Sequence, residues 1–425
     1  MTIPLLILPI VLLAFGFPVF VVLLASAAAA VVVFMDLPLV ALYQSMFGVV
    51  DAFALLAIPF FIYAGELMGR GSIARRIVDV VNEATGNVRG KIGLTTVGTN
   101  AIFGAISGSA PATVATVGKL MLPSLRKAGY PEHVSAGLLA SAGTIDILIP
   151  PSIPLLIYGV AASESVPRLY AAGLLPALLV AALTAAYVMY IARTHGIEDG
   201  SRFSLKGASA AIGRSAFALL PPVIILGGIY GGIFSPTEAA GVACVAAALV
   251  TRFIYRELSW ADILDIGRQT SFVTAQIMII LAAAGVFAWV LTVNQIPQVL
   301  ANWLQAMDLA QWLLLFAVNI VLLIIGMFLD PIAAILVVTP LVAPIMKAAG
   351  VDMIHFGVVV SLNLALGLFH PPFGLNMFVV QSAFRFPLEV IIRGMWPVLG
   401  VQLVALVIVT YVPALSLWLP RLLFN

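Results

Sequence analysis

The sequence predicts an all-α polytopic membrane protein that contains an inverted structural repeat with two re-entrant hairpins and two broken helices. Of its 425 residues, 63% are hydrophobic and only 9% are charged, and the mean hydropathy is +1.16. A soluble protein of this size could not keep so much apolar surface from water, so a lipid bilayer must surround most segments. The net charge of +2 gives no sign of a nucleic-acid partner, and the single cysteine, Cys244, excludes an internal disulfide.

A proline pair that occurs twice predicts the repeat. Pro150-Pro151 ends a glycine-containing apolar segment, and Pro371-Pro372 ends a similar one 221 residues later. Proline removes a backbone donor and glycine weakens a helix, so neither segment can remain helical throughout. In a bilayer such a break is tolerated only where protein or a water-filled cavity satisfies the freed backbone groups. Two interrupted segments at corresponding positions of two halves predict the binding site of a secondary transporter.

Hydropathy and turn residues place the remaining elements. In the first half we expect two short helices within 3–34 separated at Gly16–Pro18, a third segment from about 47 to 68 and a surface arm at 69–91. These are followed by a hairpin of half-length helices at 94–127, a broken helix at 133–163, a span at 169–192 and a basic linker at 193–214. In the second half we expect spans at about 216–234, 239–252 and 271–293, an arm at 296–307, a hairpin at about 311–347, a broken helix at about 353–382 and a last span at 395–418.

The basic residues predict the orientation of the two halves. Arginine and lysine interleave with apolar residues in the first arm, which indicates a helix on the cytoplasmic membrane surface. The second arm, at 296–307, has no lysine or arginine and fits the outer face. The two halves are therefore expected to be inverted relative to each other.

Hairpin tips and helix breaks that meet in mid-membrane expose oxygen atoms and half-helix ends. Carbonyl and hydroxyl oxygens are suitable ligands for Na⁺, and the positive N-terminal ends of half-helices suit a carboxylate. The candidate oxygen sources are Asn100, Ser107, Gly108, Ser109, Thr113, Gly143, Thr144 and Asp146 in the first half, and Gly326, Asp330, Thr339, Asn363, Gly367 and Asn376 in the second.

Simpler explanations exist for several of these residues. Serine and glycine in membrane helices often only mediate close packing, and a proline pair can be a simple kink. Asp330 either coordinates a cation or hydrogen-bonds the backbone of the tip, and Asp146 could instead lie in a solvated cavity. No basic residue is expected in the pocket, so the sequence does not specify the solute.

Several motifs resemble the large membrane subunit of tripartite ATP-independent periplasmic (TRAP) transporters. They lie between about residues 50 and 395, and they are Leu56-Ala-Ile-Pro59-Phe-Phe, Gly65-Glu66-Leu-Met, Gly104-Ala-Ile-Ser107-Gly108-Ser109-Ala, Leu148-Ile-Pro150-Pro151-Ser152-Ile, Ser235-Pro236-Thr237-Glu238-Ala-Ala and Pro371-Pro372-Phe-Gly374-Leu-Asn376. The resemblance implies an elevator-type importer, similar to the ion transporter superfamily, in the bacterial inner membrane. It also implies Na⁺ coupling, a small four-helix membrane subunit, and a periplasmic binding protein that delivers an organic acid.

The resemblance implies a division into scaffold and transport domain. Scaffold helices and the cytoplasmic arm occupy 1–93, the first transport half 94–165, further scaffold, linker and outer arm 166–310, the second transport half 311–385 and a terminal span 386–425. One Na⁺ would lie at the first tip with Gly143 to Asp146, and another at the second tip with Asn363 to Gly367. The solute would lie between the proline pairs, beside Thr113, Pro150, Pro151, Ser152, Pro371, Pro372 and Asn376.

The chain departs from the family pattern at Asp146, where glycine is usual, and at Pro111 and Thr113. The sequence predicts the large permease subunit of a Na⁺-coupled importer and not an enzyme. One alternative is a stand-alone Na⁺/carboxylate symporter that needs no binding protein. A remote alternative is an intramembrane hydrolase with Ser107 as nucleophile, although no histidine is placed at a matching depth.

Overall fold

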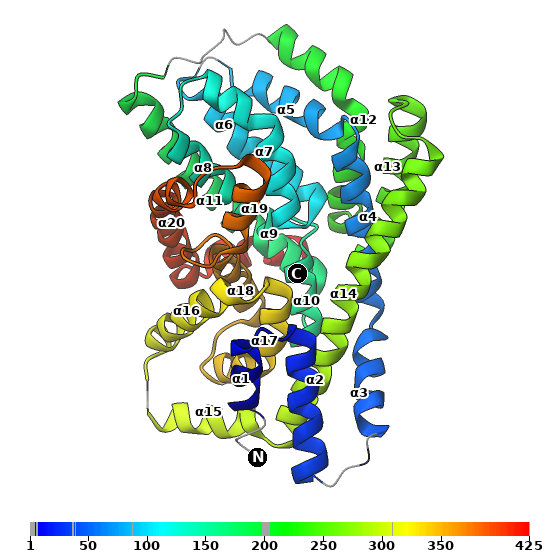
Figure 1. The fold of residues 1–425 in the computed structure, drawn as a ribbon, viewed down its shortest axis with the longest axis vertical. Helices are drawn as coiled ribbons and strands as arrows, with labels where there is room; N and C mark the ends of the chain where they lie inside the picture. Colours follow the sequence, from blue (N-terminus) through cyan, green and yellow to red (C-terminus); the bar gives the residue numbers. More distant parts are fainter. Residues whose placement is uncertain are drawn as a thin grey trace.

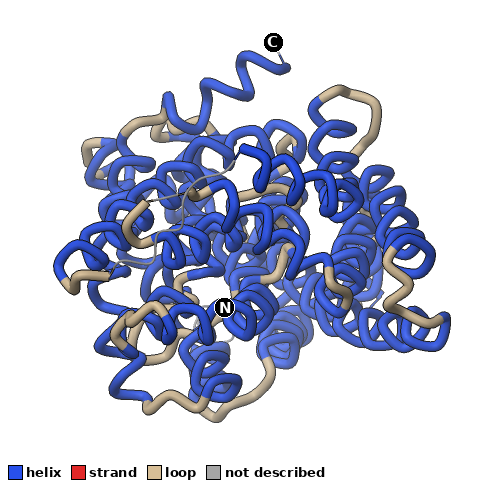
Figure 2. The backbone as a smooth tube through the Cα atoms, turned by 90° about the horizontal axis from the view of Figure 1, so that it is seen from above, coloured by secondary structure: helices blue, strands red, loops and turns tan. Residues whose placement is uncertain are grey.

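The computed structural model describes residues 5, 7–35, 38, 40–86, 88–197, 205–307 and 309–424, and within them helices joined by turns and loops are the regular structure (Figures 1 and 2). The first-half helices are α1 (Leu8–Ala14), α2 (Val19–Ala30), α3 (Val40–Val50), α4 (Ala57–Arg70), α5 (Ile73–Ala84), α6 (Lys91–Ser107), α7 (Ala110–Lys127), α8 (Glu132–Ala140), α9 (Ala142–Leu148), α10 (Ile153–Ala162) and α11 (Val166–Thr194). The others are α12 (Leu205–Tyr230), α13 (Pro236–Leu249), α14 (Trp260–Val293), α15 (Ile296–Ala306), α16 (Gln311–Phe328), α17 (Pro331–Ala348), α18 (Met353–Gly367), α19 (Leu375–Phe384), α20 (Leu388–Tyr411) and α21 (Ala414–Phe424).

Seven helices or helix combinations are long and apolar enough to cross a membrane, and an eighth is the bent pair 132–148 with 153–162. The predicted class, an all-α polytopic membrane protein, is therefore confirmed. In Figure 1 the arm helices α5 and α15 lie at opposite ends of the molecule, and α9, α10 and α18 lie between them.

The first arm is amphipathic, as expected. Ile73, Ala74, Ile77 and Val81 of α5 are buried, and α5 packs against α12 and α6. A Cβ atom on Gly98 of α6 would lie 2.7 Å from Val81 Cγ1, so the arm and the first hairpin approach each other closely. This contact joins the arm to the hairpin that carries part of the site.

Both hairpins turn where the sequence predicts. Gly108 connects α6 to α7 in the left-handed region at φ 58°, and Leu329-Asp330 connects α16 to α17. The helices of the first hairpin are longer than the half-length helices expected, since α6 has 17 residues and α7 has 18. At 1.5 Å per residue such a helix is about 27 Å long.

The two breaks also lie where expected. Residues 149–152 separate α9 from α10, with a bend of 43° between the segments on either side, and residues 368–374 separate α18 from α19. The Pro150-Pro151 and Pro371-Pro372 bonds are both cis. The same local backbone feature therefore occurs twice, 221 residues apart.

Three predicted segments differ from the structure. The segment from 47 to 68 is divided, because α3 ends at Val50 and a 3₁₀ turn at Phe53–Leu56 precedes α4. The span at 271–293 begins earlier, because Ser259 and Asp262 form a capping box that starts α14 at Trp260. The last span is two helices, since Pro413 cannot continue α20. Arg202 of the predicted linker lies outside the described residues.

The elements with breaks are packed together in the interior. The helix α20 packs on α8, where Gly137 and Gly394 bring the two backbones into contact, and α11 packs on α6, α9, α18 and α20. The helices α2, α3 and α4 pack on α14, and α4 also packs on α13. Helix α14 contacts α17 and α4 contacts α6, so these two helices border the hairpins.

Candidate functional site

A cavity of about 780 Å³ lies between the hairpins and the helices α4 and α14. Ser107, Gly108 and Ser109 of the first tip and Asp330 of the second tip line it together. The walls continue through Ile147 and Ile153, on both sides of the first break, and through Glu66 and Gln269. Leu368, the first residue of the second break, lines it too, so the structure brings both tips and residues at both breaks to a common space, as the sequence predicts.

The first tip rests on the first break. The Ser107 hydroxyl donates a hydrogen bond to the Ser109 carbonyl oxygen at 3.3 Å. A Cβ atom on Gly108 would lie 3.1 Å from the Pro151 carbonyl oxygen, and its φ is positive, so glycine is required for the turn and for the close approach. Ser152 caps α10 by accepting a 3.2 Å hydrogen bond from the Leu155 N–H, and its hydroxyl donates to the Ile147 carbonyl oxygen across the break.

Asp146 is fully buried in α9. One of its carboxylate oxygens accepts a 2.8 Å hydrogen bond from the Thr113 hydroxyl of α7, and the other has no hydrogen-bond partner. That second oxygen would lie 2.9 Å from a Cβ atom on Gly104, so α6 covers it. The alternative that Asp146 lies in a solvated cavity is therefore wrong, because three helices close around it.

Buried oxygen atoms without a hydrogen-bond donor occur in both halves. Among them are oxygens of Thr99, Asn100, Thr144 and Asp146 in the first half and of Thr339, Ser361 and Asn363 in the second, and others, such as those of Tyr170 and Gln402, lie outside the predicted sites. Buried polar atoms are normally paired, so such atoms indicate a missing partner such as a cation or water. These donor types fit a hard monovalent cation such as Na⁺.

The second half has a chain of buried amides and a hydroxyl. Asn363 of α18 donates a 2.6 Å hydrogen bond to Asn319 of α16, which donates a 3.1 Å bond to Thr410 of α20. Asn319 and Thr410 were not among the predicted site residues, although an amide inside an otherwise apolar hairpin helix is a detectable signal. At the same level Gly367 packs directly against the backbone of Gly326.

Asp330 caps the second hairpin. Its carboxylate accepts a 3.0 Å hydrogen bond from the Ile332 N–H, and its side chain is exposed to the cavity that both tips line. Of its two expected roles, hydrogen bonding to the tip backbone is confirmed, and cation coordination stays a prediction.

The two halves meet through Asn376. Its amide donates a 3.0 Å hydrogen bond to the Ala140 carbonyl oxygen at the end of α8, and a Cβ atom on Gly143 would lie 3.1 Å from that amide nitrogen. The residues predicted to contact the solute do not line the 780 Å³ cavity: Thr113, Pro150, Pro151, Ser152, Pro371, Pro372 and Asn376.

The cavity contains basic residues that were not expected there. Arg70 and Arg75, at the junction of α4 and α5, and Lys119 of α7 all line it. The prediction of a pocket without basic residues concerned the solute position beside the proline pairs, which do not line this cavity, so it stays a prediction. Arg70 and Arg75 were assigned to the surface arm. Lys119 is the one charged residue between Ile92 and Leu125, and this isolated charge in an apolar hairpin is the sequence feature that indicates a functional residue.

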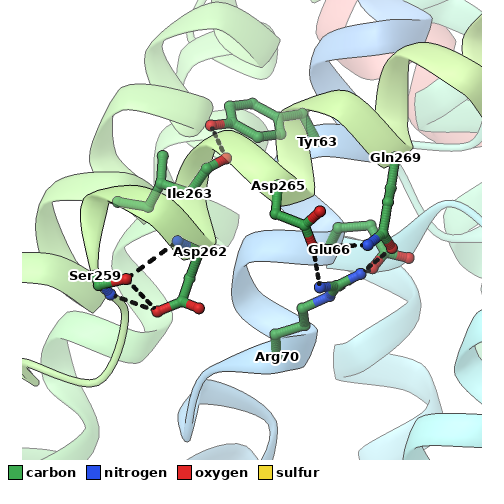
Figure 3. Close-up of polar contacts among 8 residues, drawn as sticks. All are labelled: Tyr63, Glu66, Arg70, Ser259, Asp262, Ile263, Asp265 and Gln269. Atoms are coloured by element: carbon green, nitrogen blue, oxygen red, sulfur yellow. Dashed lines mark hydrogen bonds and ion pairs between the residues drawn. The ribbon is translucent and has the colours of Figure 1, made fainter.

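Arg70 is held by a polar network between α4 and α14 (Figure 3). Its guanidinium lies 3.7 Å from Glu66 and 3.4 Å from Asp265, and it also donates to the Gln269 side-chain oxygen. Gln269 in turn donates a 2.7 Å hydrogen bond to Asp265. Arg70 is thus neutralised by two carboxylates.

Comparisons with known proteins agree with this architecture. The profile of the DctM component of the tripartite ATP-independent periplasmic transporter matches residues 6–415. The C4-dicarboxylate TRAP transporter large permease protein of Pseudomonas aeruginosa is 41% identical over 396 residues, which cover 93% of each chain. The ectoine/5-hydroxyectoine TRAP transporter large permease protein of Ruegeria pomeroyi is 36% identical over 419 residues, with 98% of each chain covered.

A solved structure shares the fold. The crystal structure of the YdaH transporter of Alcanivorax borkumensis aligns with a TM-score of 0.67 at 15% sequence identity, and the alignment covers 97% of this chain and 98% of that one. The relatives of the present chain are transporters and not enzymes, so the expectation of a non-enzymatic protein is confirmed. The chain belongs to the DctM family of large permease components of tripartite ATP-independent periplasmic transporters.

Proposed function

We propose that this chain is the Na⁺-driven permease of an importer for a small organic acid or similar solute, acting by an elevator mechanism in the bacterial inner membrane. The observation that carries this proposal is the convergence of both hairpin tips and the first break on one cavity. TRAP large permeases work with a small membrane subunit and a periplasmic binding protein, and we expect both partners here.

The cation sites would use oxygens of the tips and breaks in each half. Asn100, Ser107, Gly108, Ser109, Gly143, Thr144 and Asp146 would hold one Na⁺, and Gly326, Asp330, Asn363 and Gly367 would hold another. Bound Na⁺ supplies positive charge that lets an anionic solute enter a region of low dielectric constant. The helices α7 and α17 begin at the two tips, and α10 begins at the first break. The dipoles of these helices would orient a carboxylate.

The packing supports a moving body. The hairpins pack with the broken helices, whereas α2, α3 and α4 pack with α14, and α13 packs with α4. In an inverted repeat the two hairpins would alternate in facing the two sides of the membrane. The opposite positions of the arms α5 and α15 in Figure 1 support this arrangement.

The test is uptake by proteoliposomes that contain the chain and its small membrane subunit. Radiolabelled succinate, ectoine and sialic acid are offered separately, with and without the binding protein and with an inward Na⁺ or K⁺ gradient. We expect accumulation of one solute only with Na⁺ and the binding protein together. Uptake in K⁺ alone would refute Na⁺ coupling, and uptake without the binding protein would favour the stand-alone symporter.

A further inference from the structure

Two basic residues of the cavity wall lack a carboxylate partner. Lys119 of α7 and Arg75 of α5 are both exposed, and neither takes part in an ion pair within the part of the chain that the structure describes. Two basic residues close to Arg75 in the sequence do have carboxylate partners. Arg70 contacts Glu66 and Asp265, and Arg76 lies 3.8 Å from Glu257. The free positive charge of this wall therefore comes from one arm residue and one hairpin residue.

Lys119 is far from the first tip. Lys119 follows Ser109 by ten residues on α7, which is about 15 Å along a helix. A four-carbon acid with bonds near 1.5 Å spans only about 5 Å. A small solute at the tip therefore cannot contact Lys119 at the same time.

The surroundings of Arg75 and Lys119 favour an anion. The helices α5 and α7 pack against each other, so the two cations belong to neighbouring elements that line one cavity. A cleft that carries charge of one sign concentrates ions of the opposite sign. The guanidinium and the ammonium both lack an internal acceptor, so a carboxylate is their natural ligand.

We propose that Arg75 and Lys119 form a second anion subsite, separate from the tips, that binds a carboxylate of a small organic acid. The existence of this subsite does not depend on Na⁺ coupling. Its role rests on the proposed function: if the hairpin moves relative to the arm, Lys119 approaches Arg75 in one conformation only. The solute then binds to this subsite after the solute has left the tips and before it is released from the protein.

The single cysteine allows a direct test on the full-length chain in lipid nanodiscs. Cys244 is replaced by alanine, and Thr116→Cys, in the cavity wall between the tip and Lys119, serves as the reporter. The rates at which an anionic and a cationic methanethiosulfonate reagent modify it are compared. We expect the ratio of anionic to cationic rate to fall about tenfold in Lys119→Gln with Arg75→Gln, because cation-lined clefts raise local anion concentration by at least this factor.

The control is Arg126→Gln, which removes one positive charge from the helix that carries Lys119, but from a residue paired with Glu132 at 3.2 Å and outside the cavity wall. The control should leave the ratio unchanged. An equal fall in the control, or no fall in the double variant, would overturn the proposal. In addition, succinate should slow the anionic modification in the parent and lose this protection in the double variant. A lack of protection in the parent would show that the two cations only attract anions and bind none.

Discussion

The hydroxyl of Thr113 donates a 2.8 Å hydrogen bond to the carboxylate of Asp146, and this bond joins the first hairpin to the first broken helix. The residue 221 positions after Asp146 is Gly367, which has no side chain and packs on the backbone of Gly326. The two halves thus use different contacts at equivalent positions. Asp146 lies where the family resemblance leads us to expect glycine, and it gives the first half a buried carboxyl group that the second half lacks there.

Removal of the Thr113 hydroxyl should destabilise the protein. Thr113→Val keeps the shape of the side chain but leaves the buried Asp146 without its hydrogen-bond donor, which costs about 1–3 kcal/mol. The measurement is thermal unfolding of the purified chain in detergent. Thr194→Val, at an exposed position with only local hydrogen bonds, is the control and should have almost no effect. Equal unfolding temperatures for the two variants would contradict this account of Asp146.

A methyl group at Gly367 should separate the second hairpin from α18. The added Cβ atom would collide with the backbone of Gly326, which cannot move aside as a flexible side chain can. We expect Gly367→Ala to lower stability by about 1–3 kcal/mol, as overpacking typically does. Gly400→Ala on α20 meets nothing within 4 Å and is the matched control. The prediction fails if both substitutions are tolerated equally in the same unfolding measurement.

Two substitutions test the cation sites at the tips. Ser109→Ala removes a hydroxyl from the first tip, and Asp330→Asn removes the charge of the second while it keeps an oxygen that can cap α17. Each should raise the Na⁺ concentration needed for half-maximal uptake several-fold, since one hydrogen-bonding or charged ligand contributes about 1–3 kcal/mol. Ser382→Ala, on the exposed side of α19, is the control. An unchanged Na⁺ dependence in both tip variants would remove these residues from the sites.

The Arg70 network should contribute only modestly to stability. Its groups are between 38% and 48% exposed, so solvent screens the charges. A double-mutant cycle of Arg70→Gln and Asp265→Asn should give a coupling energy of about 0.5–1 kcal/mol from unfolding measurements. A coupling energy of several kcal/mol would mean that the cavity wall is far less hydrated than the exposure of these side chains indicates.

The sequence located the elements whose signals are local. Glycine, proline and apolar periodicity act on the backbone within a few residues, so the tips at Gly108 and Asp330, the breaks before Ser152 and after Gly367, and the amphipathic arm could all be predicted. Helix lengths were predicted less well, because caps such as Ser259 with Asp262 extended α14 beyond its hydrophobic segment.

Only the tertiary structure decided which of these elements surround each polar group. The burial of Asp146 depends on Gly104 and Thr113 from two other helices, and the amide chain of Asn319, Asn363 and Thr410 joins three helices. The same holds for the cavity, where Arg75 and Lys119 lie on one wall although 44 residues separate them. The sequence by itself determined where the chain turns and breaks, since those are short-range effects of backbone chemistry. Packing between distant helices decided which charges are paired, buried or free, because that depends on side chains that approach only after the chain has folded.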